Sequence, residues 1–464
     1  MSDASPYFVV YDGTSMNRLN VIALALVGAL FFVWPIPHTG SLRDLLLVVS
    51  CVLCGYLAWR QKFSLGVLRV LSFPATALLA FTVWAYVVAI FISPETSWSL
   101  DEINGQWLRA LAALATGIVT ALAVRRNPIL KPWALVVVFV ALMVHIVYVD
   151  LEAVKYWVGH AGSYRFDGLT GGPDKINYLS NMLFCFLLAE LFYRATSTKR
   201  MLLFPNSVLA VIFLLAVVSE FGELTRNGII TLVLMLLVLG SLYLFGRKNR
   251  SKISAAFVGV IAMFLVVLVG VGLVTSARQS STLGNLMATV PLAWDTEHNK
   301  AWQDTEKYGV PKLPSGEPVD ISTYLRVAWF KEGLKLVSEH PLGVGYGRNA
   351  YGHGMMAKYG MSKGHSHSGL LDIAIGVGIP GATLWIVFFA SLIYLAYRRI
   401  RTAPNYPAVL LLLVSVDYGT RVLLDSVQRD HMLQQFMFLA GLAAVMMVTE
   451  TRTVVRNKVA KKHG

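Results

Sequence analysis

Twelve long apolar stretches divide the chain, and this feature restricts its fold more than any other. A helix rises about 1.5 Å per residue, so roughly 20 apolar residues cross the hydrocarbon core of a bilayer, which is about 30 Å thick. The stretches cover residues 19–37, 43–60, 71–93, 107–124, 132–149, 176–194, 203–220, 227–246, 254–275, 369–397, 405–420 and 431–450. None shows the short alternation of a transmembrane β-barrel. The pattern therefore predicts an all-α polytopic membrane protein with twelve transmembrane helices.

The composition favours the same class. Hydrophobic residues make up 56% of the chain and charged residues only 14%, whereas charged residues are about 25% of a soluble domain. Cys51, Cys54 and Cys185 all lie inside expected spans, which indicates packing and no disulfide framework. The first eighteen residues carry one cation, Arg18, and no cleavage site of small residues, so the first span is expected to be retained.

The cations of the short connections alternate along the chain. Every second connection is basic, and so is the C-terminal tail. These connections hold Arg60, Lys62 and Arg69; Arg125, Arg126 and Lys131; Arg194, Lys199 and Arg200; Arg247, Lys248, Arg250 and Lys252; and Arg398, Arg399 and Arg401. Because basic loops stay in the cytoplasm, both termini are expected there. The net charge of +14 follows from this asymmetry, and the scatter of the cations over separate loops argues against nucleic-acid binding.

Two connections on the opposite side are long, at 150–175 and 276–368. The second can hold several helices, and Asp320 is expected to cap one that ends before His340-Pro341. An amphipathic piece at 286–304 precedes it. We therefore divide the chain into spans one to nine (1–275), a large helical loop on the side opposite the cytoplasm (276–368), spans ten to twelve (369–450) and a basic cytoplasmic tail (451–464).

Three arginines are expected on the outward side. Arg165 lies in the shorter long loop, Arg226 at the outer mouth of span eight, and Arg326 on the capped helix. A guanidinium suits a diphosphate, because it stays charged and makes two parallel hydrogen bonds. Each could instead pair with a nearby acid, such as Glu223 or Asp167.

Two histidines, His365 and His367, precede span ten. They could be ligands of a metal, but a catalytic zinc site needs a third ligand and the sequence has no typical zinc spacing. They could be buried residues that only pack. A general base is the third option, because imidazole titrates near neutral pH.

Other residues around this segment bear on the same question. Asp372, Asp417 and Asp425 could each orient an imidazole. Glycines and a proline at 376–381 predict a kink and close packing at the start of span ten.

At these residues the sequence resembles the bacterial O-antigen ligases, within the ligase/polymerase superfamily. Their pattern His-[Asn/Ser/Gln]-x9-Gly-x2-[Gly/Thr/Tyr] enters a late span. His367-Ser368, Gly378 and Gly381 fit this pattern, whereas His365 does not.

Three further segments are similar to motifs of that family, and the resemblance covers roughly residues 160–430. LTRNG (224–228) resembles a short Arg-Gly motif. YLRVAWFKEGLKLVSEHPLGVGYG (324–347) resembles an Arg-x2-Trp helix followed by His-Pro-Leu-Gly-x-Gly. YRFDGLTGGPDKINYLS (164–180) is similar to an Arg…Gly…Asn-Pro-Asn segment, with Ile-Asn in place of Pro-Asn.

The resemblance implies a GT-C-like, metal-independent glycosyltransferase at the periplasmic face of the bacterial inner membrane, acting in lipopolysaccharide biosynthesis. Such an enzyme transfers polysaccharide from undecaprenyl diphosphate to a sugar hydroxyl of lipid A–core, with inversion. It implies no cofactor, and its partners would be the lipid-linked donor, the lipid A–core acceptor and membrane lipids. The implied roles are His367 as general base; Arg226, Arg326 and Arg165 as ligands of the diphosphate; and His365, Asp425, Asp417 and Arg348 as supporting residues.

Three other functions are alternatives to the ligase. An O-antigen polymerase of the same superfamily uses a similar donor and a lipid-linked repeat as acceptor; the span count and the single dominant loop favour the ligase. A protein-glycosylating relative would be expected to carry a further outward domain at its C-terminus. A flippase or transporter would be expected to show related halves, and no such symmetry is visible.

Overall fold

The computed structural model describes residues 18–62, 65–160, 166–197, 199–223, 226–245, 281–361, 364–429 and 431–460. Within these ranges the regular elements are helices, and one isolated bridge joins Lys312 and Pro318. Eight helices in the described part of the chain are long and apolar enough to cross a membrane. The chain is therefore an all-α polytopic membrane protein, as the apolar stretches predicted.

The eight candidate spans are α2 (Gly40–Arg60), α3 (Ser72–Phe91), the joined α4 (Thr96–Glu102), η2 (Ile103–Trp107) and α5 (Leu108–Val124), α6 (Leu130–Gly159), α7 (Pro173–Ser197), α15 (Gly369–Thr402), α16 (Tyr406–Leu424) and α17 (His431–Ala460). Three shorter apolar helices are α1 (Arg18–Val33), α8 (Asn206–Glu223) and α9 (Arg226–Phe245). The other elements are η1 (Leu65–Leu71), α11 (Ser281–Trp294), η3 (Lys300–Trp302), α12 (Thr305–Tyr308), α13 (Ile321–Glu339), α14 (Ala350–Tyr359) and η4 (Val427–Arg429).

The number of twelve spans stays a prediction. The three shorter helices coincide with three more of the expected stretches, and the stretch 254–275 lies outside the described residues. Two helices run about ten residues past their predicted ends: α17 continues to Ala460 instead of ending at 450, and α6 continues to Gly159 instead of ending at 149. Polar residues after 149 lower the hydropathy there, but no glycine or proline interrupts the helix before Gly159.

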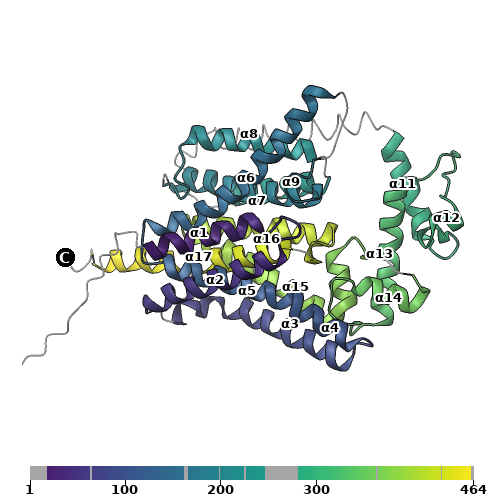
Figure 1. Ribbon diagram of the computed structural model, residues 1–464, viewed down its shortest axis with the longest axis horizontal. Coiled ribbons are helices and arrows are strands. Elements are labelled where there is room, and N and C mark those ends of the chain that lie inside the picture. The colour runs from purple at the N-terminus through teal and green to yellow at the C-terminus, as the bar shows by residue number, and fades with distance from the viewer. Residues whose placement is uncertain are drawn as a thin grey trace, which may run out of the picture.

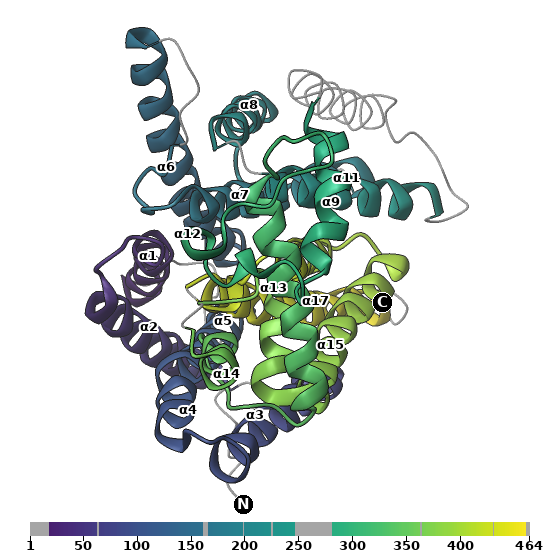
Figure 2. The same cartoon turned by 90° about the vertical axis from the view of Figure 1, so that its right-hand side faces the viewer.

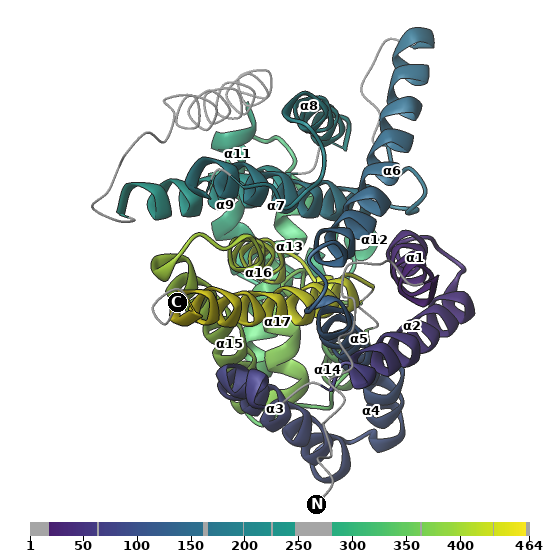
Figure 3. The same ribbon diagram turned by 90° about the vertical axis from the view of Figure 1, so that its left-hand side faces the viewer.

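The long helices run across Figure 1, and α11 to α14 gather at one end of them. Figure 2 looks onto this end, where α13 and α14 pack on α15. Figure 3 shows the other end, toward which α17 runs. Helices α7 and α17 form the centre, since 94% of each span is buried, compared with 28% for α2.

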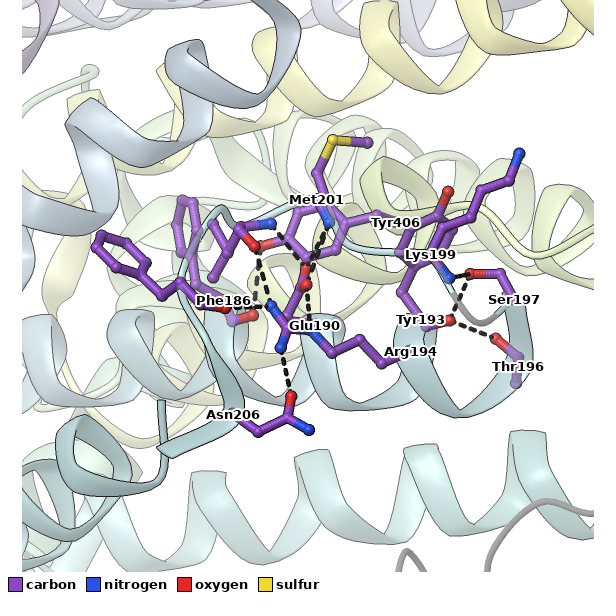
Figure 4. A network of polar contacts seen from close by, with 12 residues as sticks. Phe186, Glu190, Tyr193, Arg194, Thr196, Ser197, Lys199, Met201, Asn206 and Tyr406 are labelled. Atoms are coloured by element: carbon purple, nitrogen blue, oxygen red, sulfur yellow. Dashed lines mark hydrogen bonds and ion pairs between the residues drawn. The ribbon is translucent and has the colours of Figure 1, made fainter. Parts of the chain in front are cut away.

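Successive spans alternate in direction, so the basic connections α5–α6, α7–α8 and α15–α16 fall at the end opposite α11–α14 (Figure 1). Figure 4 shows how the α7–α8 connection is held. Arg194 donates to the Glu190 carboxylate at 2.6 Å and to two carbonyls of the connection at 2.9 Å. The carboxylate also accepts from the backbone N–H groups of Met201 and Leu202. Arg194 belongs to the basic connections that indicate the orientation, and it also stabilises the conformation of this loop.

The helix expected in the large loop is confirmed as α13. Asp320 caps it, and its side chain accepts from the backbone N–H of Thr323 at 2.7 Å. Buried residues of α11, α13 and α14 form a second small core, and Leu371 and Ile375 of α15 belong to it. Part of the large loop is thus packed directly on the first turns of α15.

Candidate active site

The helix that follows the two histidines, α15, is broken in its third turn. Gly378 has φ 70° and ψ −179°, a conformation that is essentially confined to glycine. The segment 341–345 docks at this break through three backbone hydrogen bonds of 2.9 Å. They run from Val344 N–H to Ile375 O, from Gly345 N–H to Gly376 O and from Ile379 N–H to Pro341 O. The predicted kink is confirmed, and the His-Pro-Leu-Gly-x-Gly segment satisfies backbone groups that the break exposes.

The two histidines lie in a short segment between α14 and α15. His367 has φ 59°, in the left-handed region, which costs a residue other than glycine roughly 1–2 kcal/mol. Its backbone N–H donates to Nδ1 of His365 at 3.3 Å. The two rings meet edge to face, with centroids 4.3 Å apart. His365 therefore supports the conformation of His367 directly.

The acid that faces His367 is Asp425, which ends α16. Its Oδ1 lies 3.8 Å from Nδ1 of His367. Burial would raise the pKa of the Asp425 carboxyl, but the His367 imidazole, the Ser426 N–H and the charge of His365 together lower it below its usual value. The carboxylate is thus ionised at neutral pH, where it stabilises an imidazolium.

The same three residues raise the question of a metal. Within the described part of the chain, His365, His367 and Asp425 form the one group of three metal-ligating residues whose ligand atoms lie within 4.8 Å of one another. Their residue types suit zinc. However, Nδ1 of His365 already accepts the N–H of His367, and Nδ1 of His367 faces Asp425. These contacts fit an acid–base cluster, and both Nε2 atoms are still able to bind a metal.

Helix α13 brings a tryptophan to the histidine and carries one of the predicted arginines a turn away. The Trp329 ring stacks on the His367 ring, with centroids 5.5 Å apart and planes 4° from parallel. Arg326 lies one turn earlier on the same face of the helix and is exposed. Among the described residues it has no hydrogen bond or ion pair. Gly333 allows this approach, since a Cβ there would lie 2.6 Å from the Leu371 side chain of α15.

The predicted diphosphate ligand Arg226 is the first residue of α9, and its side chain lies outside what the structure describes. Two residues later, Gly228 packs against the buried side chains of Asn177 and Glu220, which a Cβ at Gly228 would overlap. Asn177 donates its amide to Glu220 at 3.0 Å. This pair fixes the first turn of α9, and with it the backbone of Arg226.

A buried ion pair continues this network into α16. Arg421 donates to Asp417 at 3.2 Å, to the carbonyl of Asn177 at 3.1 Å and to its side-chain oxygen at 2.5 Å. Asp417 therefore neutralises Arg421 and makes no ion pair with His367. The Arg421 carbonyl accepts from the N–H of Asp425 at 2.7 Å, which links the network to the acid of the site.

A cleft of about 650 Å³ opens beside Asp425 and His365. Its lining is polar and carries both charges: the side chains include Glu102, Asp174, Lys175, Arg348, Asn349 and Ser426. Arg348 donates from Nε and Nη2 to the two carboxylate oxygens of Glu102, both at 2.9 Å. The predicted supporting residue Arg348 thus forms a wall of this cleft.

The structure gathers His365, His367 and Asp425 and places Arg326 one turn from Trp329, which stacks on His367. It leaves Asp417 apart from them. Arg165 lies outside the described residues. Sequence reasoning missed the contact roles of Trp329, Asn177 and Glu220. For Trp329 and Asn177 a signal was present, since both belong to segments that resembled family motifs.

The fold and the site together define a polytopic helical membrane protein with a histidine–carboxylate site at one end of its bundle. Residues 208–386 match the family model described as O-antigen ligase, which supports membership of the O-antigen ligase superfamily. Its members are glycosyltransferase-like ligases and polymerases that act on lipid-linked polysaccharide. The matched stretch contains Arg226, α13, the 341–345 segment and His367. Comparison with curated proteins gave no match.

Proposed function

We propose that this protein is an O-antigen ligase that transfers polysaccharide from undecaprenyl diphosphate to a sugar hydroxyl of lipid A–core. The observation that carries the proposal is the convergence on His367 of an ionised carboxylate, Asp425, and of the helix that bears Arg326. These residues come from three separate elements of a chain in this superfamily, and they have the chemistry that glycosyl transfer from a diphosphate needs.

In this proposal His367 is the general base. It takes the proton of the acceptor hydroxyl while the oxygen attacks the anomeric carbon of the donor sugar. The bond from that carbon to the diphosphate oxygen breaks on the opposite side, so the configuration inverts. Asp425 stabilises the imidazolium that forms, as an acid does for the histidine of a serine protease. A positioned base contributes typically about 10²–10⁴-fold to a rate.

The leaving diphosphate gains negative charge as the bond breaks, and fixed cations stabilise that charge. Arg326 is suited to this role, because it is exposed and makes no hydrogen bond or ion pair among the described residues. We assign Arg226 and Arg165 to the same role on their predicted positions. The cleft beside Asp425 suits a carbohydrate acceptor, because hydroxyl groups both donate and accept and its walls offer carboxylates, an amide, a hydroxyl and cations.

The proposal includes a GT-C-like arrangement of twelve spans in the bacterial inner membrane, with both termini cytoplasmic and the site periplasmic. The large loop at 276–368 and the tail at 451–464 keep the roles assigned above. The orientation is supported by the gathering of basic connections at the end opposite α11–α14 (Figure 1).

The reaction products test the proposal directly. Purified protein is given an undecaprenyl-linked glycan with either lipid A–core or a second lipid-linked glycan as acceptor. Glycan on lipid A–core is the expected product. Extension of the second lipid-linked glycan alone would instead identify a polymerase, and no transfer to either would contradict both.

Substitution of the base provides a second test. His367→Ala is expected to abolish transfer while membrane insertion and folding persist. His298→Ala is a matched control, because His298 forms an exposed pair with Asp295 at 2.9 Å outside the site. EDTA is expected to leave the rate unchanged. Near-normal transfer by His367→Ala would refute the base, and a loss in EDTA that a divalent cation restores would instead indicate a metal at His365, His367 and Asp425.

A further inference from the structure

One buried carboxylate near the site does not contact the His367 ring. Asp372 lies in the first turn of α15, and only 3% of its surface is exposed. Its Oδ1 accepts from the backbone N–H of Ser366 at 2.9 Å. Its Oδ2 accepts from the Ser426 hydroxyl at 2.5 Å and from the Gln428 amide at 3.3 Å. Both carboxylate oxygens are therefore hydrogen-bonded to neighbouring segments.

The partners of Asp372 immediately adjoin the two residues of the acid–base pair. Ser366 precedes His367, and Ser426 follows Asp425. A backbone hydrogen bond also joins the two segments, since the Gly369 N–H donates to the Asp425 carbonyl at 3.0 Å. Asp372 is thus the side chain that joins the segment carrying the histidine to the segment carrying its acid.

The histidine needs such a restraint for two reasons. Its backbone is left-handed, a conformation that persists in residues other than glycine when the surroundings impose it. Its Nδ1 also lies 3.8 Å from Asp425, so a small movement of either segment would separate the pair. On the far side of Asp425, the Gln106 side chain donates to the Gln428 carbonyl and anchors that segment to η2.

We propose that Asp372 is a positioning residue that holds His367 and Asp425 together for catalysis without contacting the substrate. The effect on catalysis rests on the proposed function, whereas the hydrogen bonds by which Asp372 joins the two segments do not depend on it. Because its role is to accept three hydrogen bonds, Asp372→Asn can largely replace it: a hydroxyl and an amide can each turn to accept from the new NH₂. Asp372→Ala leaves the same donors without an acceptor.

Transfer kinetics give the first test. Asp372→Ala is expected to lower kcat by roughly 10²-fold, as for a misplacement of about 1 Å, with an unchanged KM for the lipid-linked donor. Asp372→Asn should recover most of the rate. An Asn variant as inactive as the Ala variant would overturn the proposal and point to a role for the charge.

The second test needs no transfer assay. Diethyl pyrocarbonate modifies neutral imidazoles, and mass spectrometry of the peptides reports His367 and His298 separately in one sample. The groups facing His367 are His365, Asp425 and Trp329. In Asp372→Ala the modification of His367 should become faster, because its ring is no longer held against Asp425 and Trp329, while that of the exposed His298 stays unchanged.

Ser426→Ala removes only one of the three hydrogen bonds, so it should accelerate the modification of His367 by less than Asp372→Ala does. A rate of His367 modification that is identical in the wild type, Asp372→Ala and Ser426→Ala would refute the positioning role, whatever the transfer assay gives. If the wild type transfers no glycan while the rate of His367 modification changes as expected in the variants, the proposed function fails and the positioning role stands.

Discussion

The break in α15 should tolerate no side chain at Gly378. In Gly378→Ala the backbone would stay at φ 70°, which costs an alanine about 1–3 kcal/mol. The new Cβ would also lie 2.5 Å from the carbonyl oxygen of Pro341 and 2.6 Å from Cα of Leu342. Both are backbone atoms that cannot rotate away, and overpacking of this kind costs about 1–3 kcal/mol more. The free energy of unfolding should therefore fall by about 2–6 kcal/mol.

The change is measured by equilibrium unfolding in detergent micelles, followed by tryptophan fluorescence, and by the transfer rate of the folded fraction. The rate should fall as well, because displacement of the 341–345 segment shifts the start of α15, which begins directly after His367-Ser368. Gly55→Ala is the matched control. Gly55 lies in α2 with no atom within 4 Å of a new Cβ, so the same substitution should not destabilise.

One result would contradict this prediction. If Gly378→Ala unfolds at the same denaturant concentration as Gly55→Ala and transfers glycan at the wild-type rate, the docking of 341–345 in the break does not hold the site.

Two further substitutions test other contacts of the site. Gly228→Ala should raise the KM for the lipid-linked donor several-fold, because the new Cβ overlaps the Glu220 and Asn177 side chains and displaces the first turn of α9; an unchanged KM in a folded variant would show that this packing does not position Arg226. Trp329→Ala should lower kcat about fivefold, since a stacked aromatic contact of roughly 1 kcal/mol is lost, whereas Trp329→Phe should lower it less. Equal rates for the two variants would show that the ring contact is not what matters.

Much of the architecture could be predicted from the sequence, because its signals are local. The length of an apolar stretch determines whether a helix can cross a bilayer, and Lys and Arg in adjacent loops bias its direction. The cap at Asp320 and the kink at Gly378 were likewise predicted from residues at those positions. The end of α6 was placed too early, because hydropathy reports burial in lipid and not the continuation of a helix through polar residues.

The partners within the site could not be predicted in the same way. Asp372, Asp417 and Asp425 were equivalent candidates by spacing, yet each has a different role: Asp425 faces the imidazole, Asp372 joins two segments, and Asp417 neutralises Arg421. These roles depend on contacts between residues far apart in the chain. Sequence spacing carries no information on such contacts.

The sequence by itself determined the class of protein, the order of its helices and the short list of histidines, acids and arginines. These follow from hydrophobicity, charge and motif spacing. Only the tertiary structure decided which of those residues meet. The packing of α13 on α15 brings Trp329 onto His367, and the end of α16 brings Asp425 to its Nδ1. The physical reason is that interactions of a few ångströms depend on how helices cross, and crossing is set by the side chains of both partners at once.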